Sequence, residues 1–390
     1  MLDLIIRQAN LDGDLKDLGI QGDTLVAIAD HLSDPTHREV FADGRVAIPG
    51  FVDCHLHLDK CLLNEKSPYV EGTGPEKGAL TLKRKVDFTL EDITLRAETM
   101  IQRAIASGTL ALRTNVDVDA SVGLKGVQAL IALREKYRSL LTIQVAAFAQ
   151  EGVFADGQTE ALLEEALNLG ADLVGGHTIA KGEGEKHIDF ILSLAKKYNV
   201  DADFHLDESG QRQHYLLPYV TQQMKALGLS GRVNGIHNCT LAALEAQELQ
   251  EALERMVDQH LSVTVAPTAI STRSLAPVKK LLDVGLLVGL GSDNIRDFFN
   301  PLGSGDIKHA ALILSYAHRF FTADEQAAIW KMITVNGAAL LKLPHYGLTL
   351  GAKADVTILD ALTPQTVIAY TAQPVFLVRS GNVILDRLER

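Results

Sequence analysis

Residues 49–60 read PGFVDCHLHLDK. An apolar run after a Pro-Gly turn is typical of a buried strand, and side chains alternate along a strand, so His55 and His57 point to the same side. Two imidazoles on one side of a strand can share one metal ion. Because a His-x-His pair alone is weak evidence, the prediction depends on what other strands place beside it.

Other polar side chains stand at the ends of apolar runs further along the chain. His205 closes the run at 200–204, and Glu208 follows three residues later. Gln150, His237 and Asp293 close three more runs. If these runs are parallel strands of one sheet, all of these side chains lie at the same edge and can form a metal site with the His-x-His pair.

The spacing of the strand ends predicts the fold. Eight candidate ends lie near the following residues: His55, Asn115, Gln150, Gly176, His205, His237, Pro267 and Asp293. After the first connection, successive ends are 26 to 35 residues apart. One βα unit of a TIM barrel takes about 30 residues, so the sequence predicts an α/β fold, a (β/α)8 TIM barrel whose C-terminal rim carries the site. We interpret most of the remaining histidines as structural, although His177 also follows a strand end.

The two ends of the chain differ from the middle, because both consist of short β-prone runs separated by glycines. We therefore expect residues 1–48 and 346–390 to form one small, discontinuous β-sandwich domain, and residues 49–345 to form the barrel. Residues 62–88 make an unusually long first connection, and such connections are often functional lids. Directly after it, Thr89 is placed to begin a helix that continues towards Gly108.

Composition excludes several classes of protein. The chain has 37 Lys and Arg against 49 Asp and Glu, a net charge of -12, which argues against a nucleic-acid partner. The apolar runs are shorter than the roughly 20 residues of a membrane span, and the N-terminus does not resemble a signal peptide. Three cysteines are too few for a disulfide framework, so we expect a cytoplasmic location. The expected partner is a small molecule, and the chain could form a homo-oligomer.

Taken together, these segments resemble the amidohydrolase superfamily, and within it the cytosine deaminase-like branch. The resemblance covers essentially the whole chain and is carried by residues 49–60, 113–117, 147–152, 205–208, 237–240, 291–294 and 346–356. It implies a (β/α)8 barrel with a small β domain. It also implies one divalent metal ion, zinc or iron, held by His55, His57, His205 and Asp293.

The resemblance also implies catalytic roles. Asp293 can bind the metal and accept a proton from water, because a divalent cation lowers the pKa of bound water towards about 7. Glu208 can carry a proton to the leaving group, and His237 can stabilise the developing charge. Gln150 offers one donor and one acceptor to a heterocycle, and it stands where binuclear relatives have an anionic bridge, which favours a single metal ion.

Two positions depart from cytosine deaminases. Asn294 stands where those enzymes have a second aspartate, and Lys60 stands where they have threonine. Together with Arg273, which is either a substrate ligand or a solvated loop residue, these changes favour a carbonyl-rich or anionic substrate.

The predicted activity is therefore metal-dependent hydrolysis of a C–N bond in a small N-heterocycle. Deamination of a cytosine-like ring by a metal-bound hydroxide is the first choice. Removal of an alkylamine from a triazine-type ring and opening of a cyclic amide are the enzymatic alternatives. A non-catalytic metal-binding protein on the same fold is the alternative from another class.

Overall fold

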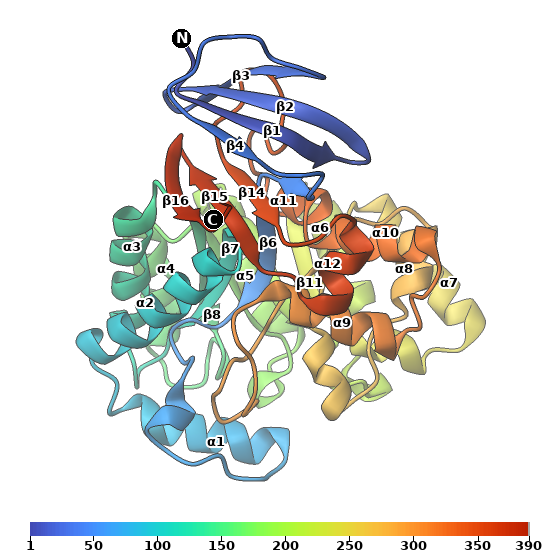
Figure 1. Cartoon of the computed structure of the whole chain (residues 1–390). Coiled ribbons are helices and arrows are strands. Elements are labelled where there is room, and N and C mark those ends of the chain that lie inside the picture. Colours follow the sequence, from blue (N-terminus) through green and yellow to red (C-terminus); the bar gives the residue numbers. More distant parts are fainter. Residues whose placement is uncertain (389–390) are drawn as a thin grey trace.

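The computed structural model describes residues 1–388 and contains one eight-stranded parallel sheet and two four-stranded sheets (Figure 1). The parallel sheet consists of β6 Phe51–Leu56, β7 Thr109–Asp117, β8 Thr142–Ala149, β9 Leu173–His177, β10 Asp201–Leu206, β11 Val233–His237, β12 Ser262–Val265 and β13 Val288–Leu290. Each strand pairs with the next one in the chain. A parallel bridge between Leu56 and Asp293 brings the last strand end back to the first and closes the barrel. The predicted (β/α)8 barrel is confirmed.

Helices fill the connections between the barrel strands, and further helices follow the last strand. Those in the connections include α2 Leu90–Ala106, α3 Lys125–Tyr137, α4 Thr159–Asn168, α5 Glu185–Tyr198, α6 Leu217–Leu227, α7 Ala246–Asp258 and α8 Val278–Asp283, and those that follow β13 include α9 Ile307–Ala317, α10 Ala323–Met332 and α11 Val335–Leu340. The helix predicted after Thr89 is α2, and the Thr89 hydroxyl accepts a hydrogen bond from the Asp92 amide, as an N-cap should.

The long first connection is not a structureless loop. It contains a short 3-10 turn, η1 Leu63–Glu65, and then α1 Gly74–Lys85, which begins with a capping box between Thr73 and Glu76. α1 lies at the end of the barrel opposite the N-terminus of the chain (Figure 1). This is the end at which β6 finishes and the predicted site begins.

Two sheets pack face to face at the other end of the barrel. One has the order β3-β2-β1-β4, with β1 Leu4–Leu11, β2 Asp14–Gln21, β3 Thr24–Ala29 and β4 Glu39–Phe41. The second has the order β16-β15-β14-β5, with β5 Ala47–Ile48, β14 Val356–Leu359, β15 Pro374–Arg379 and β16 Asn382–Asp386. A shared apolar cluster fills the space between them and includes Ile6, Leu18, Val356 and Phe376.

Three elements of this region lie outside the β-prone runs of the sequence. They are β2, whose sequence DLKDLGIQ is rich in charged residues, β4, which has three residues, and α12 Pro364–Tyr370, which interrupts the C-terminal strands. The domain boundaries at residues 48 and 345 stay a prediction.

Arg379 ties the second sheet to the start of the barrel. Its guanidinium is 1% exposed and donates to the carbonyl oxygens of Pro49 at 3.0 Å and Gly108 at 3.3 Å, and to the Thr357 hydroxyl at 3.2 Å. Because Pro49 precedes β6, these bonds hold the strand that carries the His-x-His pair.

We expect Arg379→Met to lower the free energy of unfolding by about 2–3 kcal/mol, because three acceptors lose a charged donor in a buried site. Chemical denaturation would measure the loss. Arg387→Met, at an exposed position on the same C-terminal segment, is the matched control and should change stability by less than about 0.5 kcal/mol. Equal stability of the two variants would show that the Arg379 contacts contribute nothing.

Within residues 1–388, no helix combines the length and the apolar composition needed to cross a bilayer.

Candidate active site

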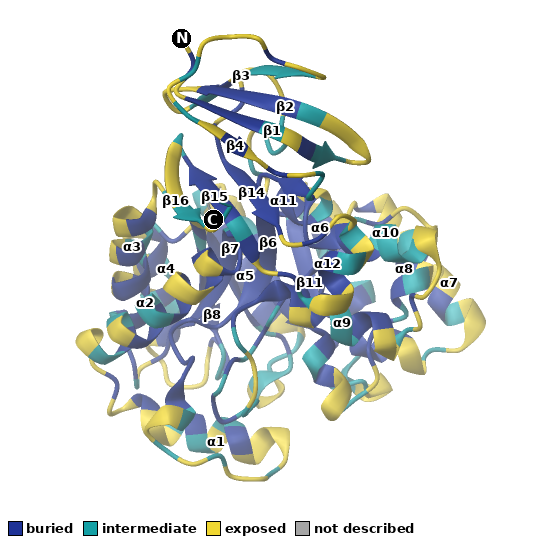
Figure 2. Ribbon diagram, viewed as in Figure 1, coloured by how far each residue is buried: buried dark blue, intermediate teal, exposed yellow. Residues whose placement is uncertain are grey.

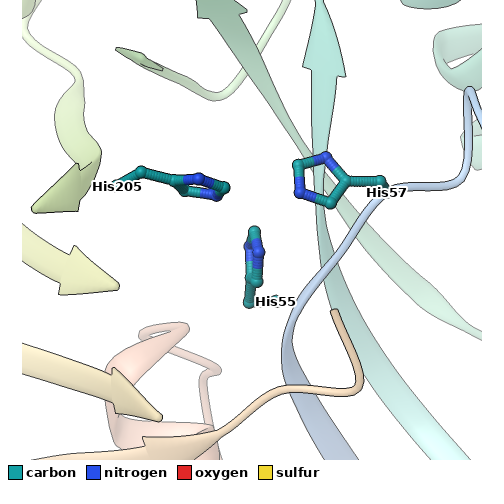
Figure 3. Close-up of side chains that lie close together, drawn as sticks. All are labelled: His55, His57 and His205. Atoms are coloured by element: carbon teal, nitrogen blue, oxygen red, sulfur yellow. The ribbon is translucent and has the colours of Figure 1, made fainter. Parts of the chain in front are cut away.

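His55 and His57 point into the barrel from the end of β6, as the strand alternation predicts. Their rings lie 4.8 Å apart between centroids, and the His205 ring lies 5.0 Å from His55 and 5.4 Å from His57. Figure 3 shows the three rings converging on one space. All three side chains are buried, so β6 and β10 deliver three imidazoles to one point.

The Nδ1 atoms of His57 and His205 contact oxygen atoms outside the cluster, and these contacts determine which ring nitrogen faces it. His57 Nδ1 lies 3.1 Å from the carbonyl oxygen of Asn115, which can only accept a hydrogen bond, so Nδ1 carries the proton. His205 Nδ1 lies 3.0 Å from Glu208 Oε2 in the same way. Both Nε2 atoms are therefore left with a lone pair, which is the form that binds a metal ion.

Asp293 and His237 complete the group. Asp293 Oδ1 lies 3.2 Å from His55 Nε2 and 3.5 Å from His57 Nε2, and its amide donates to the carbonyl oxygen of His55 at 2.9 Å. His237 ends β11, and its ring lies 4.8 Å from the His205 ring. β13 and β11 thus add a carboxylate and a fourth imidazole.

The donor set fits a divalent cation. The ligand atoms of His55, His57 and His205 all lie within 4.8 Å of one another, and so do those of His55, His237 and Asp293. Several ring nitrogens are buried without a hydrogen-bond partner, including His205 Nε2 and both nitrogens of His237. Buried polar atoms are normally paired, so this concentration of unpaired nitrogens is what a metal site looks like without its ion.

Burial and neighbouring charges shift the pKa values at this site. Burial lowers the pKa of His237 to about 3 and that of His57 well below its usual value, which keeps both imidazoles neutral. Burial alone would raise the pKa of Asp293, but the hydrogen bond from His55 and the adjacent histidines hold it below its usual range. Neutral His57 and His237 beside an ionised carboxylate are in the protonation states that a metal ion requires. Burial lowers the pKa of His55, but the hydrogen bond to Asp293 outweighs it and raises that pKa above its usual value.

Glu208 lies beside this cluster and is held by three basic side chains. Arg273 Nη2 donates to Oε1 at 2.5 Å, His205 Nδ1 lies 3.0 Å from Oε2, and His177 Nε2 lies 3.1 Å from Oε2. Burial raises the pKa of Glu208, but Arg273 and the histidines outweigh that effect and hold it well below its usual value. Glu208 is thus an anion that can accept a proton.

Lys60 and Gln150 form a second polar group at the mouth. Lys60 Nζ is 2.8 Å from Asp117 Oδ1 and 3.3 Å from Gln150 Oε1. Because an ammonium can only donate, Oε1 must be the Gln150 atom that faces Lys60, and the Gln150 amide nitrogen is left to donate elsewhere. The sequence led us to expect one donor and one acceptor from Gln150, whereas the structure uses its acceptor for Lys60.

The other two predicted substrate residues have partners inside the protein. Asn294 Nδ2 donates to Asp297 Oδ2 at 2.5 Å, and Arg273 is bound to Glu208 rather than solvated. The structure therefore brings His55, His57, His205, His237, Glu208 and Asp293 into one cluster and places Lys60, Gln150, Asn294 and Arg273 around it.

His177 is the residue of this group that sequence reasoning undervalued. It ends β9, and its ring lies 5.9 Å from the His205 ring in addition to its contact with Glu208. Its position at a strand end was the available signal.

Comparison with known proteins agrees with the fold. The chain matches the amidohydrolase family over residues 91–384. It is 35% identical to the N-isopropylammelide isopropyl amidohydrolase of Pseudomonas sp. strain ADP, over 98% of this chain and 97% of that protein. The chain belongs to the amidohydrolase family, whose members are hydrolases.

Two solved structures are similar over nearly their full length. The N-isopropylammelide isopropylaminohydrolase from Burkholderia multivorans superposes with a TM-score of 0.91 at 28% identity, covering 100% of this chain and 99% of that one. The 5-methylcytosine deaminase from Klebsiella pneumoniae liganded with phosphonocytosine has a TM-score of 0.91 at 28% identity, with 98% of each chain covered. The predicted superfamily is thus confirmed.

Proposed function

We propose that this protein hydrolyses the C–N bond between an oxo-substituted N-heterocycle and an exocyclic amino group, releasing ammonia, with one divalent metal ion bound at the centre of the barrel mouth. The observation that carries the proposal is the convergence of His55, His57, His205 and Asp293, with the carboxylate of Glu208 beside them. The similar proteins are named as an N-isopropylammelide isopropyl amidohydrolase and a 5-methylcytosine deaminase, and these names support the same reaction class.

The metal ion, zinc or iron, would be held by His55, His57, His205 and Asp293, and it would supply a water of lowered pKa at neutral pH. The ionised Asp293 is placed to take a proton from a water molecule that attacks the ring carbon. His237 is neutral and neither ring nitrogen has a hydrogen-bond partner, so its one N–H can donate to the oxygen that adds to that carbon.

Glu208 is placed to carry protons to the substrate. Its carboxylate is anionic in the free protein, so it can take one proton of the attacking water and donate it to the leaving nitrogen as the C–N bond breaks. The other proton of the water, taken by Asp293, passes to a ring nitrogen of the oxo product. Arg273 and His177 fix the carboxylate from both oxygens and prevent it from turning away. The products are the oxo heterocycle and the free amine.

Lys60 and Gln150 set the substrate preference, because both present only donors to a ligand. Lys60 uses two of its three N–H groups on Asp117 and Gln150, and the Gln150 amide nitrogen adds another donor. A ring edge that carries carbonyl oxygens matches these donors, whereas a ring edge of amino groups would leave them unpaired.

A second candidate is release of an alkylamine instead of ammonia from a triazine-type ring. The favouring observation is the 35% identity, over 97% of its length, to a protein named for N-isopropylammelide. The two activities share every catalytic step and differ only in the space available to the leaving group.

Three further expectations belong to the proposal. One ion per chain is expected, because Gln150 lacks the charge to bridge two cations.

All three cysteines are free and buried, which agrees with a reducing, cytoplasmic location. The division into a barrel of residues 49–345 and a domain of both chain ends completes the proposed organisation.

A product screen tests the proposal. We expect purified, metal-loaded protein to release ammonia or an alkylamine from amino-oxo pyrimidines or amino-oxo triazines, with kcat/KM at least about 100-fold above that for rings without carbonyl groups. Enzyme-coupled ammonia detection and mass spectrometry would identify the products.

The same screen separates the alternatives. A carboxylate product without free amine would indicate ring opening and would overturn the deamination proposal. No turnover of any ring by protein that carries a full complement of metal would favour the non-catalytic binding protein.

A further inference from the structure

A buried lysine of α1 inserts its ammonium between three carboxylates of the barrel mouth. Lys85 Nζ lies 2.7 Å from Asp117 Oδ2, 2.8 Å from Asp119 Oδ2 and 3.1 Å from Glu151 Oε1. Asp117 ends β7, and Glu151 follows the end of β8. One side chain of α1 thus binds the rim at two neighbouring strands.

The central carboxylate of this group is shared with the proposed substrate site. Asp117 pairs with Lys85 through Oδ2 and with Lys60 through Oδ1, at 2.7 Å and 2.8 Å. All three side chains are 1% exposed. Lys60 also contacts Gln150, so an unbroken series of contacts runs from α1 to the two residues proposed to bind the substrate.

Charge, rather than apolar packing, attaches α1 to the mouth. The residues that α1 buries are Lys77, Thr81 and Lys85, which lie at a spacing of four and therefore on one face. The apolar contribution from α1 to the core is the partly buried Leu80. Figure 2 shows the rest of the helix as mostly exposed. With so little apolar area buried, the position of the helix depends on the ammonium of Lys85.

Neutralising the carboxylates does not by itself require this arrangement. A lysine on β7 or β8 could balance Asp119 and Glu151 without contacting Asp117. Lys85 instead comes from the helix next to the mouth and contacts the one carboxylate that orients Lys60. Because Asp117 contacts both Lys85 and Lys60, the position of α1 and the orientation of Lys60 depend on the same carboxylate.

We propose that Lys85 is a positioning residue for substrate recognition: it fastens α1 against the barrel mouth and, through Asp117, holds Lys60 and Gln150 in the orientation that receives an oxo-substituted ring. This inference rests on the function proposed above for Lys60 and Gln150. Because Lys85 does not contact the imidazole cluster, its loss should weaken substrate binding more than it slows the chemical step.

Steady-state kinetics of Lys85→Met provide the first test. KM should rise by about tenfold or more, whereas kcat should fall by less than about threefold. Lys66→Met is the matched control, because Lys66 lies in the same connection, is exposed and pairs with Asp92 outside the network; it should leave both constants unchanged. An unchanged KM in Lys85→Met would overturn the inference.

A second variant covers the case in which Lys85→Met does not fold. Glu151→Gln removes one partner of Lys85 and leaves the ammonium paired with two aspartates. Glu151 forms no ion pair with Lys60, but it adjoins Gln150 in the chain, so its effect on KM is interpreted together with the double-mutant cycle below. We expect KM to rise by about two- to fivefold; no change would count against the coupling.

A double-mutant cycle separates positioning from a general structural effect. If Lys85 acts through Lys60, the KM of Lys60→Met/Lys85→Met should be close to that of Lys60→Met alone, because the second substitution has nothing left to disorient. If the two fold-changes instead multiply, Lys85 acts by another route and the inference is wrong.

Limited proteolysis tests the attachment of α1 without any substrate. Proteinase K should cleave Lys85→Met within residues 62–88 at least about fivefold faster than the unmodified protein or Lys66→Met, because the helix loses its main tether. Equal cleavage rates would overturn the tether even if the protein turned over none of the rings in the screen. Normal turnover together with unchanged KM and cleavage would reject this inference and leave the proposed function standing.

Discussion

Replacing Glu208 with glutamine should lower kcat by about a thousandfold while leaving the fold and the metal content unchanged. Glutamine keeps an oxygen for Arg273 and the size of the side chain, but it cannot take up and release a proton. The contacts of Glu208 to Arg273 at 2.5 Å and to His205 at 3.0 Å show that its carboxylate is fixed beside the cluster. A fixed, ionised carboxylate is the group that proton transfer to the leaving nitrogen requires.

The measurement is kcat on whichever ring the product screen identifies, together with metal analysis and a thermal melt. Glu254→Gln, at an exposed position on α7, is the control and should behave like the unmodified protein. Metal analysis matters because His205, Glu208 and His237 also form a group that could hold an ion. If Glu208→Gln loses the metal, Glu208 is a ligand rather than a proton carrier, and a near-normal kcat would exclude both roles.

The fold could be predicted because regular spacing of strand ends is a property of the sequence alone. Steps of 26 to 35 residues leave little room for anything but repeated βα units, and the polar residues that end the runs indicate which edge carries the site. The same spacing placed His55, His205, His237 and Asp293 at one mouth. The structure brings these four together because each lies at the carboxyl end of a strand of the same parallel sheet: His55, His205 and His237 within the last two residues of their strands, and Asp293 three residues after β13.

The partners of the polar residues could not be predicted in this way. Strand spacing shows that a side chain reaches the mouth, but not which neighbour it binds there. Arg273 in a loop and Glu208 after β10 are separated by 65 residues, and their contact depends on the path of the loop after β12. His177 was undervalued for a related reason, since a lone histidine at a strand end has no local pattern that distinguishes a surface position from a contact with Glu208.

The contacts that Lys85 of α1 makes with the barrel could not be predicted from the sequence, for a different physical reason. Residues 62–88 have the composition of an exposed loop, and a lysine at the end of a polar helix is normally solvated. Lys85 is buried because Asp117, Asp119 and Glu151 surround its ammonium, and these carboxylates lie on two other segments. Burial of a charge is decided by distant partners, so hydrophobic patterning does not reveal it.

Removal of the metal ion should abolish activity and destabilise the protein reversibly. Dialysis against a chelator should reduce turnover to less than about 1%, because no side chain of the cluster can itself activate water at neutral pH. The four proposed ligands come from β6, β10 and the end of β13, so an ion that joins them links three strands of the barrel. An ion present at about 100 times its dissociation constant stabilises the folded state by about 2.7 kcal/mol, and the apo protein should therefore melt several degrees lower.

Adding back zinc or ferrous ion distinguishes this result from chelator damage and tests the number of ions. Turnover and melting temperature should recover together and saturate at one equivalent per chain, because the cluster offers one convergent set of unpaired nitrogens around Asp293. His57→Ala should saturate at a much higher metal concentration, since it removes the ligand that the Asn115 carbonyl orients. Saturation at two equivalents would show that the group of His205, Glu208 and His237 binds a second ion. Full activity in the chelated protein would remove the metal from the mechanism altogether.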